Sequence, residues 1–244
     1  MKIFNNKKVI ILGAGSSIRK YNDYIYKYLD KNKSIIIGCK NIGDIVVPDY
    51  HCWFDEAAFE RDSKISVKKG ITLINKNSIP VFLKSFDKNL IKKYWDGYYK
   101  TISCKFISWK HKNSSPKYIN GKFSGAFVNT GCLAIFWAFC MGASKIEVLG
   151  MDGYSFYSKE DLIQNKESQH CSGDGNTFFR RKNYSEEEIK NNINLLHEKL
   201  RYKDNKILRT LSYFKNEYKM DLRILTPTYY KLIYDNSVLG INDI

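Results

Sequence analysis

The sequence predicts an α/β fold with a Rossmann-like, doubly wound and mostly parallel sheet, and three observations lead to this prediction. The run VIIL at Val9–Leu12 is short, unbroken and apolar, and Gly13 follows it directly, which is typical of a central parallel strand. The run KIEVL at Lys145–Leu149 is a second strand that precedes a glycine. Between these units, the helix predicted to start at Asn129 is apolar on all sides, which indicates burial.

The other elements follow in order along the chain. After the glycine turn, Ser16 or Ser17 is expected to cap a helix whose apolar stripe contains Ile25 and Leu29. The segment Asp87–Asn120 is less regular. Short apolar runs predict strands at Ser34–Gly38, Tyr50–Phe54, Ile71–Ile74, Val81–Leu83 and Leu222–Leu225.

The C-terminal part of the chain is predicted to contain two helices. Ser185 and Glu188 form a capping box for the first helix, which runs to about Leu200. The second helix spans Ile207–Tyr218. No internal repeat and no convincing linker interrupts the sequence, so we expect one α/β domain over residues 1–244.

The segment Ser158–Asn183 lacks apolar periodicity and is rich in polar and basic residues. A stretch of this length without regular structure inside a compact domain is usually functional. We therefore expect a lid-like segment at about 155–184.

The composition limits the classes of partner. The chain is 43% hydrophobic and carries a formal net charge of +15, so it is globular and suits an acidic substrate or an anionic membrane surface. The lysines are spread along the chain, and zinc-finger, RNP and Arg-rich helix motifs are missing, so nucleic acid is not expected. A homo-oligomer stays open.

The cysteines and apolar runs indicate the compartment. The six cysteines form no CxxC pair and no zinc-like spacing, so they are expected to be reduced and buried, and no metal is expected. The sequence has no signal-peptide pattern, and its longest apolar run, Cys132–Met141, is about half a membrane span. We expect a cytoplasmic protein, with peripheral contact at the inner membrane face.

The glycine turn does not match a dinucleotide site. Ile18 stands where G-x-G-x-x-G has its third glycine. Cys39, Lys40 and Asn41 follow the predicted strand Ser34–Gly38, where a dinucleotide site would have an acidic residue for the ribose. NAD is therefore not expected, and the missing acid also counts against an adenosylmethionine-dependent methyltransferase. A purely structural role for the turn stays open.

Polar residues gather at the predicted strand ends, where open α/β sheets bind ligands. Each of them alone can be a turn or cap residue, but together they predict a nucleotide site. The candidate nucleotide-binding residues are Gly13, Gly15, Ser16, Ser17, Asn41, Asp55, Asn129, Thr130, Gly131 and Asp152.

Several motifs resemble one family in the order in which they occur. They are VIILGAGSSI at residues 9–18, Asn41, the run NTGCLAIFWAFCMGASKIEVLGMDGY at residues 129–154, and KMDLRILTP at residues 219–227. The chain resembles the bacterial sialyltransferases of glycosyltransferase family 42. It also resembles the related domain of motility accessory factors and of hydroxymethylpterin diphosphokinase-like proteins.

The resemblance implies a CMP-sugar donor, no metal, no further cofactor, and a histidine general base under a lid. It places the family's phosphate-binding tyrosines at Tyr154 and Tyr157, and its cytidine and phosphate contacts among the strand-end residues named above. Asp55 stands where the family tends to have asparagine.

The family's general base lies just before the late helix, where this chain has Tyr184. His170 is the nearest histidine, and its usual pKa suits removal of a hydroxyl proton. A solvated loop histidine is the competing interpretation. Arg180 and Arg181 are candidates for binding phosphate or an acidic acceptor, or form a solvated basic run. The remaining histidines, which are poorer candidates, are His51, His111 and His197.

These observations favour a glycosyltransferase that moves a sialic-acid-like (nonulosonic) sugar from a CMP-sugar to a surface glycan of lipooligosaccharide or capsule type. One alternative is a diphosphokinase-like enzyme on the same fold, which uses ATP with magnesium. Another is a non-catalytic nucleotide- or carbohydrate-binding module, because fold alone does not fix function.

Overall fold

The computed structural model describes residues 2–43, 45–108, 114–156, 159 and 185–241. Its centre is strand β1 (Lys8–Leu12), which pairs in parallel with β2 (Ile35–Cys39) on one side and with β8 (Lys145–Leu149) on the other. The predicted α/β class and the predicted parallel pairing are therefore confirmed.

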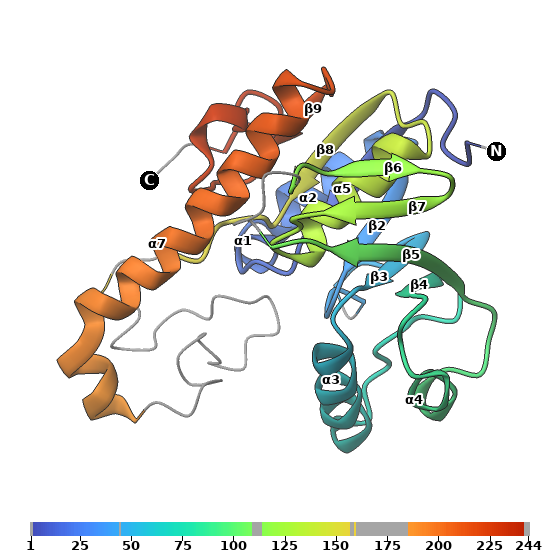
Figure 1. The fold of residues 1–244 in the computed structure, drawn as a ribbon, viewed down its shortest axis with the longest axis horizontal. Helices are drawn as coiled ribbons and strands as arrows, with labels where there is room; N and C mark the ends of the chain where they lie inside the picture. Colours follow the sequence, from blue (N-terminus) through green and yellow to red (C-terminus); the bar gives the residue numbers. More distant parts are fainter. Residues whose placement is uncertain (1, 44, 109–113, 157–158, 160–184, 242–244) are drawn as a thin grey trace.

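The described strands form one mixed, mostly parallel sheet in the order β6-β7-β5-β4-β3-β2-β1-β8-β9 (Figure 1). The strands β6 and β7 pair antiparallel, whereas the other pairings run parallel. The remaining strands are β3 (Tyr50–Trp53), β4 (Ile79–Leu83), β5 (Lys100–Phe106), β6 (Lys117–Ile119), β7 (Lys122–Gly125) and β9 (Leu222–Ile224).

Helices cover both faces of this sheet (Figure 1). Because side chains alternate along a strand, Val9 and Ile11 of β1 join the core under α5 and α7, whereas Ile10 and Leu12 pack with Ile18 on the opposite face. The described helices are α1 (Ser17–Lys20), α2 (Asn22–Lys31), α3 (Glu56–Lys69), α4 (Lys88–Tyr94), α5 (Thr130–Cys140), α7 (Glu186–Asn216) and the 3-10 helix η2 (Lys231–Ile233).

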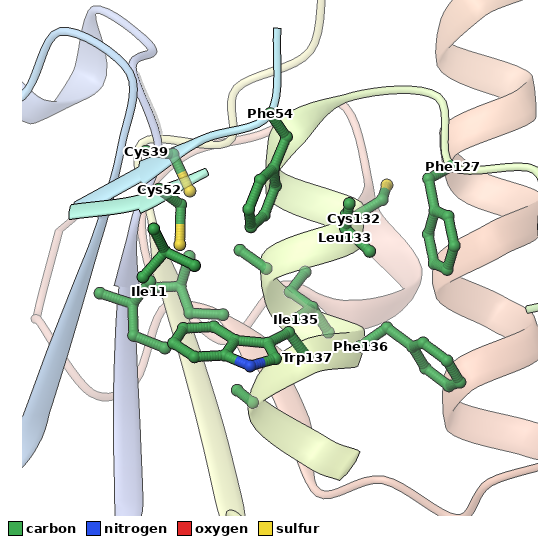
Figure 2. Packing of buried hydrophobic residues seen from close by; sticks show 14 of the residues in the cluster. Ile11, Cys39, Cys52, Phe54, Phe127, Cys132, Leu133, Ile135, Phe136 and Trp137 are labelled. Atoms are coloured by element: carbon green, nitrogen blue, oxygen red, sulfur yellow. The ribbon is translucent and has the colours of Figure 1, made fainter. Parts of the chain in front are cut away.

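Helix α5 is the buried helix that the sequence predicts. It lies against β1, β2, β3 and β8, and eight of its residues are buried. Figure 2 shows its apolar side chains packed among the strands on one side and facing α7 on the other. The ring of Phe136 stacks on Phe214 of α7, with 5.4 Å between ring centroids. This packing fixes the start of α5 near the carboxyl ends of the central strands.

Three expectations about secondary structure are wrong. Ile71–Ile74 is not a strand, because Leu73 and Ile74 are buried in the connection before β4, and a four-residue apolar run does not distinguish a strand from a buried loop. The two late helices are one helix, α7, because no glycine or proline interrupts residues 201–206. The less regular segment Asp87–Asn120 contains α4, β5 and β6.

The expected serine cap also takes another form. Ser16 precedes α1, but its side chain makes no capping hydrogen bond. The single predicted helix is also divided in two, because a short break at Tyr21 separates α1 from α2. Within the described ranges, no helix combines the length and the apolar character needed to cross a bilayer.

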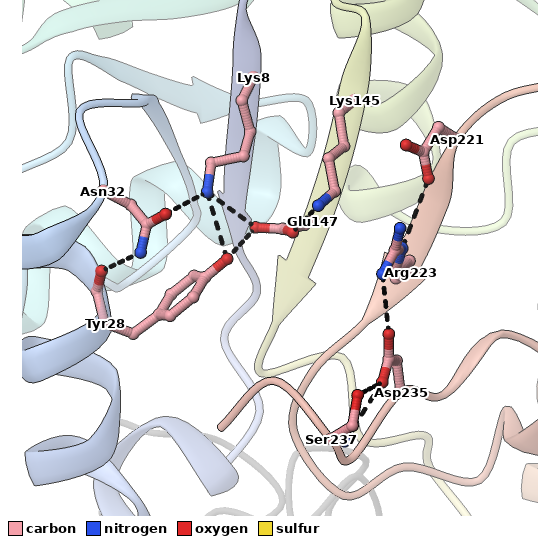
Figure 3. A network of polar contacts seen from close by, with 9 residues as sticks. All are labelled: Lys8, Tyr28, Asn32, Lys145, Glu147, Asp221, Arg223, Asp235 and Ser237. Carbon is pink, nitrogen blue, oxygen red and sulfur yellow. Dashed lines mark hydrogen bonds and ion pairs between the residues drawn. The ribbon is translucent and has the colours of Figure 1, made fainter. Parts of the chain in front are cut away.

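A buried carboxylate joins three elements at the amino ends of the central strands (Figure 3). Glu147 of β8 is fully buried, and it lies 2.8 Å from the ammonium of Lys145 and 3.4 Å from that of Lys8. The hydroxyl of Tyr28 on α2 donates to Oε2, the carboxylate oxygen that also faces Lys8, whereas Lys145 contacts Oε1. Burial alone would raise the pKa of Glu147, but these hydrogen bonds and lysine charges outweigh it, so the pKa lies below its usual 4.5.

Glu147→Gln is expected to lower the free energy of unfolding at neutral pH by about 1–2 kcal/mol, because hydrogen bonds to a charged group are lost. The stabilisation by Glu147 is present above pH 4.5 and is lost as the pH falls through the lower folded pKa. Urea unfolding at pH 7 and pH 3 tests this, since the difference in stability between the two proteins should be smaller at pH 3. An equal difference at both pH values would contradict the charged role, and exposed Glu60→Gln is the control.

Candidate functional site

A pocket opens at the carboxyl ends of β1, β2 and β8. It encloses about 690 Å³ of empty space, a volume that includes open solvent at its mouth. The strand order reverses direction here, because the chain leaves β1 toward β2 and later returns on the other side at β8. The lining residues are Ile11, Gly13, Ala14, Gly15, Cys39, Lys40, Asn129, Thr130, Gly131, Val148, Gly150, Met151, Asp152, Gly153, Tyr154 and Tyr230.

The glycine turn after β1 is pressed against the loop after β8. The amide of Gly13 donates to the carbonyl of Leu149 at 2.7 Å, and the amide of Gly15 donates to the carbonyl of Gly150 at 2.8 Å. A Cβ at Gly13 would lie 2.3 Å from the Gly150 carbonyl oxygen, and one at Gly15 would lie 2.6 Å from it. Both glycines are therefore required by the contact between the loops.

Asp152 holds the first turn of α1. Its carboxylate is buried and accepts from the amide of Ser17 at 2.9 Å and from the Ser17 hydroxyl. The amides of Gly13, Gly15 and Ser17 therefore all donate to acceptors at the end of β8 or in the loop that follows it. The turn shapes the pocket wall, and these three amides are already used within the fold.

The start of α5 forms another wall of the pocket. Asn129 caps this helix, because its side chain accepts from the amide of Cys132 at 2.8 Å. Thr130 and Gly131 belong to the first turn, whose amides have no partner inside a helix, and the positive end of the helix dipole lies here. This wall favours an anionic group in the pocket.

Asp204, a buried residue that was not among the predicted site residues, fixes the third wall of the pocket. Both Tyr154 and Tyr230 line the pocket, and both bind Asp204 of α7: the Tyr154 amide donates at 2.9 Å and the Tyr230 hydroxyl at 2.8 Å. Ser155 donates its amide and its hydroxyl to the other carboxylate oxygen, at 2.7 Å and 2.6 Å. Burial and the adjacent Asp204 charge raise the pKa of Tyr230 well above 10.

The strand-end residues of β2 and β3 divide between the pocket and its surroundings. Lys40 lines the pocket, whereas Asn41 and Asp55 do not. Asp55 caps α3 by accepting from the amide of Ala58 at 3.1 Å, and it also contacts the Lys40 ammonium at 3.3 Å. Of the residues predicted at the strand ends, the pocket brings together Gly13, Gly15, Asn129, Thr130, Gly131 and Asp152, with Tyr154.

The remaining candidates lie outside the described residues or away from the pocket. Tyr157, His170, Arg180 and Arg181 fall in the ranges that the structure does not describe, as does His111. His51 is fully buried, where desolvation lowers its pKa to about 4, and its Nε2 donates to the carbonyl of Lys40.

The described cysteines are free thiols, and Cys39, which lines the pocket, is buried, so its pKa rises to about 12. Over the described part of the chain, no group of three or more histidine, cysteine, aspartate or glutamate side chains is arranged to hold a metal ion.

Comparison with known families decides the relationship. A family model described as 6-hydroxymethylpterin diphosphokinase MptE-like matches residues 1–155. The chain belongs to the MptE-like family. The matched region contains every residue that lines the pocket except Tyr230. The pocket therefore lies almost entirely within the part of the chain that matches the family. A search of curated proteins finds no match.

Proposed function

We propose that this MptE-like protein is a nucleotide-dependent transferase whose donor nucleotide occupies the pocket at the ends of β1, β2 and β8. The observation that carries the proposal is the position of the pocket at the switch point of a parallel sheet, with the first turn of α5 facing it. The family match supports it.

The finer proposal is glycosyl transfer from a CMP-activated nonulosonic sugar to a surface-glycan hydroxyl, supported by the sequence resemblance to family 42 sialyltransferases. The acceptor oxygen bonds to the anomeric carbon as the bond from that carbon to the phosphate oxygen of CMP breaks. His170 takes the acceptor proton, Tyr154 and Tyr157 stabilise the leaving phosphate, and Arg180 and Arg181 bind phosphate or acceptor. No metal and no further cofactor take part in this scheme.

Diphosphoryl transfer is the second candidate, and the description of the matched family favours it. In that reaction a substrate hydroxyl attacks the β-phosphorus of ATP, and AMP leaves. This scheme uses magnesium on the phosphates, as phosphoryl transfer generally does.

The proposed contact with a membrane surface follows from the net positive charge of the chain. With a net charge of +15, the protein is suited to dock on an anionic membrane surface at the cytoplasmic face, where lipid-linked acceptors lie. We propose a glycan acceptor as partner and no nucleic acid.

Thermal unfolding with CMP, CDP, UDP, ATP and adenosylmethionine, each with and without magnesium, tests the proposal. A ligand at a hundredfold its Kd adds about 2.7 kcal/mol to the free energy of unfolding. We expect CMP to stabilise the protein without magnesium. In a second assay, the wild-type protein should release CMP from a CMP-sugar, and His170→Ala should lose this activity. Stabilisation by ATP with magnesium alone would assign the second candidate, and no effect of any nucleotide would contradict both.

A further inference from the structure

Lys40 lies at the end of β2 with its backbone fixed on the pocket wall. Its amide donates to the carbonyl of Cys52 at 3.1 Å, and its own carbonyl accepts from Nε2 of buried His51. The backbone has a left-handed φ of 58°, which is uncommon for a residue with a Cβ. These contacts on β3 hold the base of the lysine side chain beside the pocket.

The ammonium of Lys40 is held by an ion pair that opens at low cost. It lies 3.3 Å from Oδ2 of Asp55, and the two side chains are 24% and 47% exposed, so solvent weakens their attraction. The other oxygen of Asp55, Oδ1, accepts from the amide of Ala58 and caps α3. The lysine can therefore leave Asp55 while the cap stays in place.

The pocket walls present positive charge on the side of the ligand. Among the described residues that line it, the charged side chains are Lys40 and Asp152, and the Asp152 carboxylate is turned into the protein, onto Ser17. The first turn of α5, which also lines the pocket, adds its partial positive charge.

We propose that Lys40 is the phosphate-recognising residue of the pocket, and that its ammonium exchanges the Asp55 carboxylate for a phosphate group of the ligand. The inference rests on the proposed function and deepens it, because it assigns the ligand class and the residue that selects it. Asp55 is then a competing anion, which holds the lysine when the pocket is empty and lowers the affinity for phosphate.

Calorimetric titration of CMP, cytidine and pyrophosphate into the wild-type protein, Lys40→Met, Asp55→Asn and the double variant tests the exchange. We expect Lys40→Met to weaken CMP and pyrophosphate binding about 10- to 100-fold, the equivalent of one charge-assisted hydrogen bond, with cytidine binding nearly unchanged. Asp55→Asn should strengthen CMP binding, since asparagine keeps the helix cap and frees the lysine. The double variant should match Lys40→Met, because Asp55 acts through Lys40.

Other outcomes separate the two proposals. Equal CMP affinity of wild type and Lys40→Met overturns the inference, as does stronger binding by Asp55→Asn in the Lys40→Met background. If pyrophosphate binds in a Lys40-dependent way but no nucleotide binds, the phosphate site stands and the nucleotide proposal fails. If the wild-type protein binds neither CMP nor pyrophosphate, the inference about Lys40 and the CMP-sugar scheme are both overturned, whereas the proposed nucleotide site fails only if ATP with magnesium does not bind either.

Discussion

Asp204→Asn is expected to lower the free energy of unfolding by about 3 kcal/mol and to weaken nucleotide binding. Each carboxylate oxygen of Asp204 accepts from one backbone amide, that of Tyr154 or that of Ser155. Either orientation of the asparagine therefore places its NH₂ group against an amide donor in a buried site, which leaves a donor unpaired. The pocket wall at Gly153 and Tyr154 would lose its attachment to α7.

Urea unfolding and CMP titration measure the two effects of Asp204→Asn. The matched control is Asp221→Asn, because Asp221 is 48% exposed and its partner Arg223 is also at the surface. We expect the control to change stability by less than about 0.5 kcal/mol. Equal effects of the two substitutions would show that the Asp204 contacts do not hold the wall.

Gly13→Ala is expected to be similarly destabilising, by about 3 kcal/mol, and to reduce nucleotide binding. The added Cβ would meet the Gly150 carbonyl oxygen at 2.3 Å, and this neighbour is backbone, so the two loops must move apart. Their separation would strain the hydrogen bond from the Gly13 amide to Leu149 and open the pocket wall.

Chemical unfolding of Gly13→Ala and Gly131→Ala tests whether this close contact is the cause. A Cβ at Gly131 would meet its nearest neighbour at 3.4 Å, which is ordinary contact, and alanine favours a helix over glycine. Gly131→Ala should therefore keep or raise the stability. If Gly13→Ala proved as stable as the wild type, the tight packing of the two loops would be refuted.

The sequence predicted the sheet and the position of the pocket because both depend on local patterns. Val9–Leu12 and Lys145–Leu149 are short runs that end at glycines, and parallel strands place their carboxyl ends at one edge. The glycine turn itself had two interpretations, a ligand loop or a structural turn. In the structure its amides bind the end of β8 and the loop after it. Sequence patterns do not show this contact, because it joins residues far apart in the chain: Ser17 and Asp152 are 135 residues apart.

The contacts made by Asp204, Lys40 and Asp55 were not accessible to sequence patterns. Asp204 lies in a polar stretch that resembled a break between two helices, and its role depends on where α7 crosses the loop after β8. Asp55 was a candidate nucleotide-binding residue, whereas the structure places it at the α3 cap and beside Lys40. Capping and ion pairing depend on the relative placement of β2 and β3.

Titration of CMP, and of ATP with magnesium, into the wild-type protein and Gly131→Leu shows whether a nucleotide occupies this pocket. Gly131 lies on the pocket wall in the first turn of α5, and its nearest neighbours beyond Asn129 are side-chain atoms of Met151 at 3.7 Å. A leucine there fills the space of the ligand while it favours the helix. We expect the wild-type protein to bind one of these nucleotides, and Gly131→Leu, with an unchanged unfolding temperature, to bind it at least about tenfold more weakly. Equal affinity of the two proteins would place the nucleotide elsewhere, and binding of neither nucleotide would contradict the account.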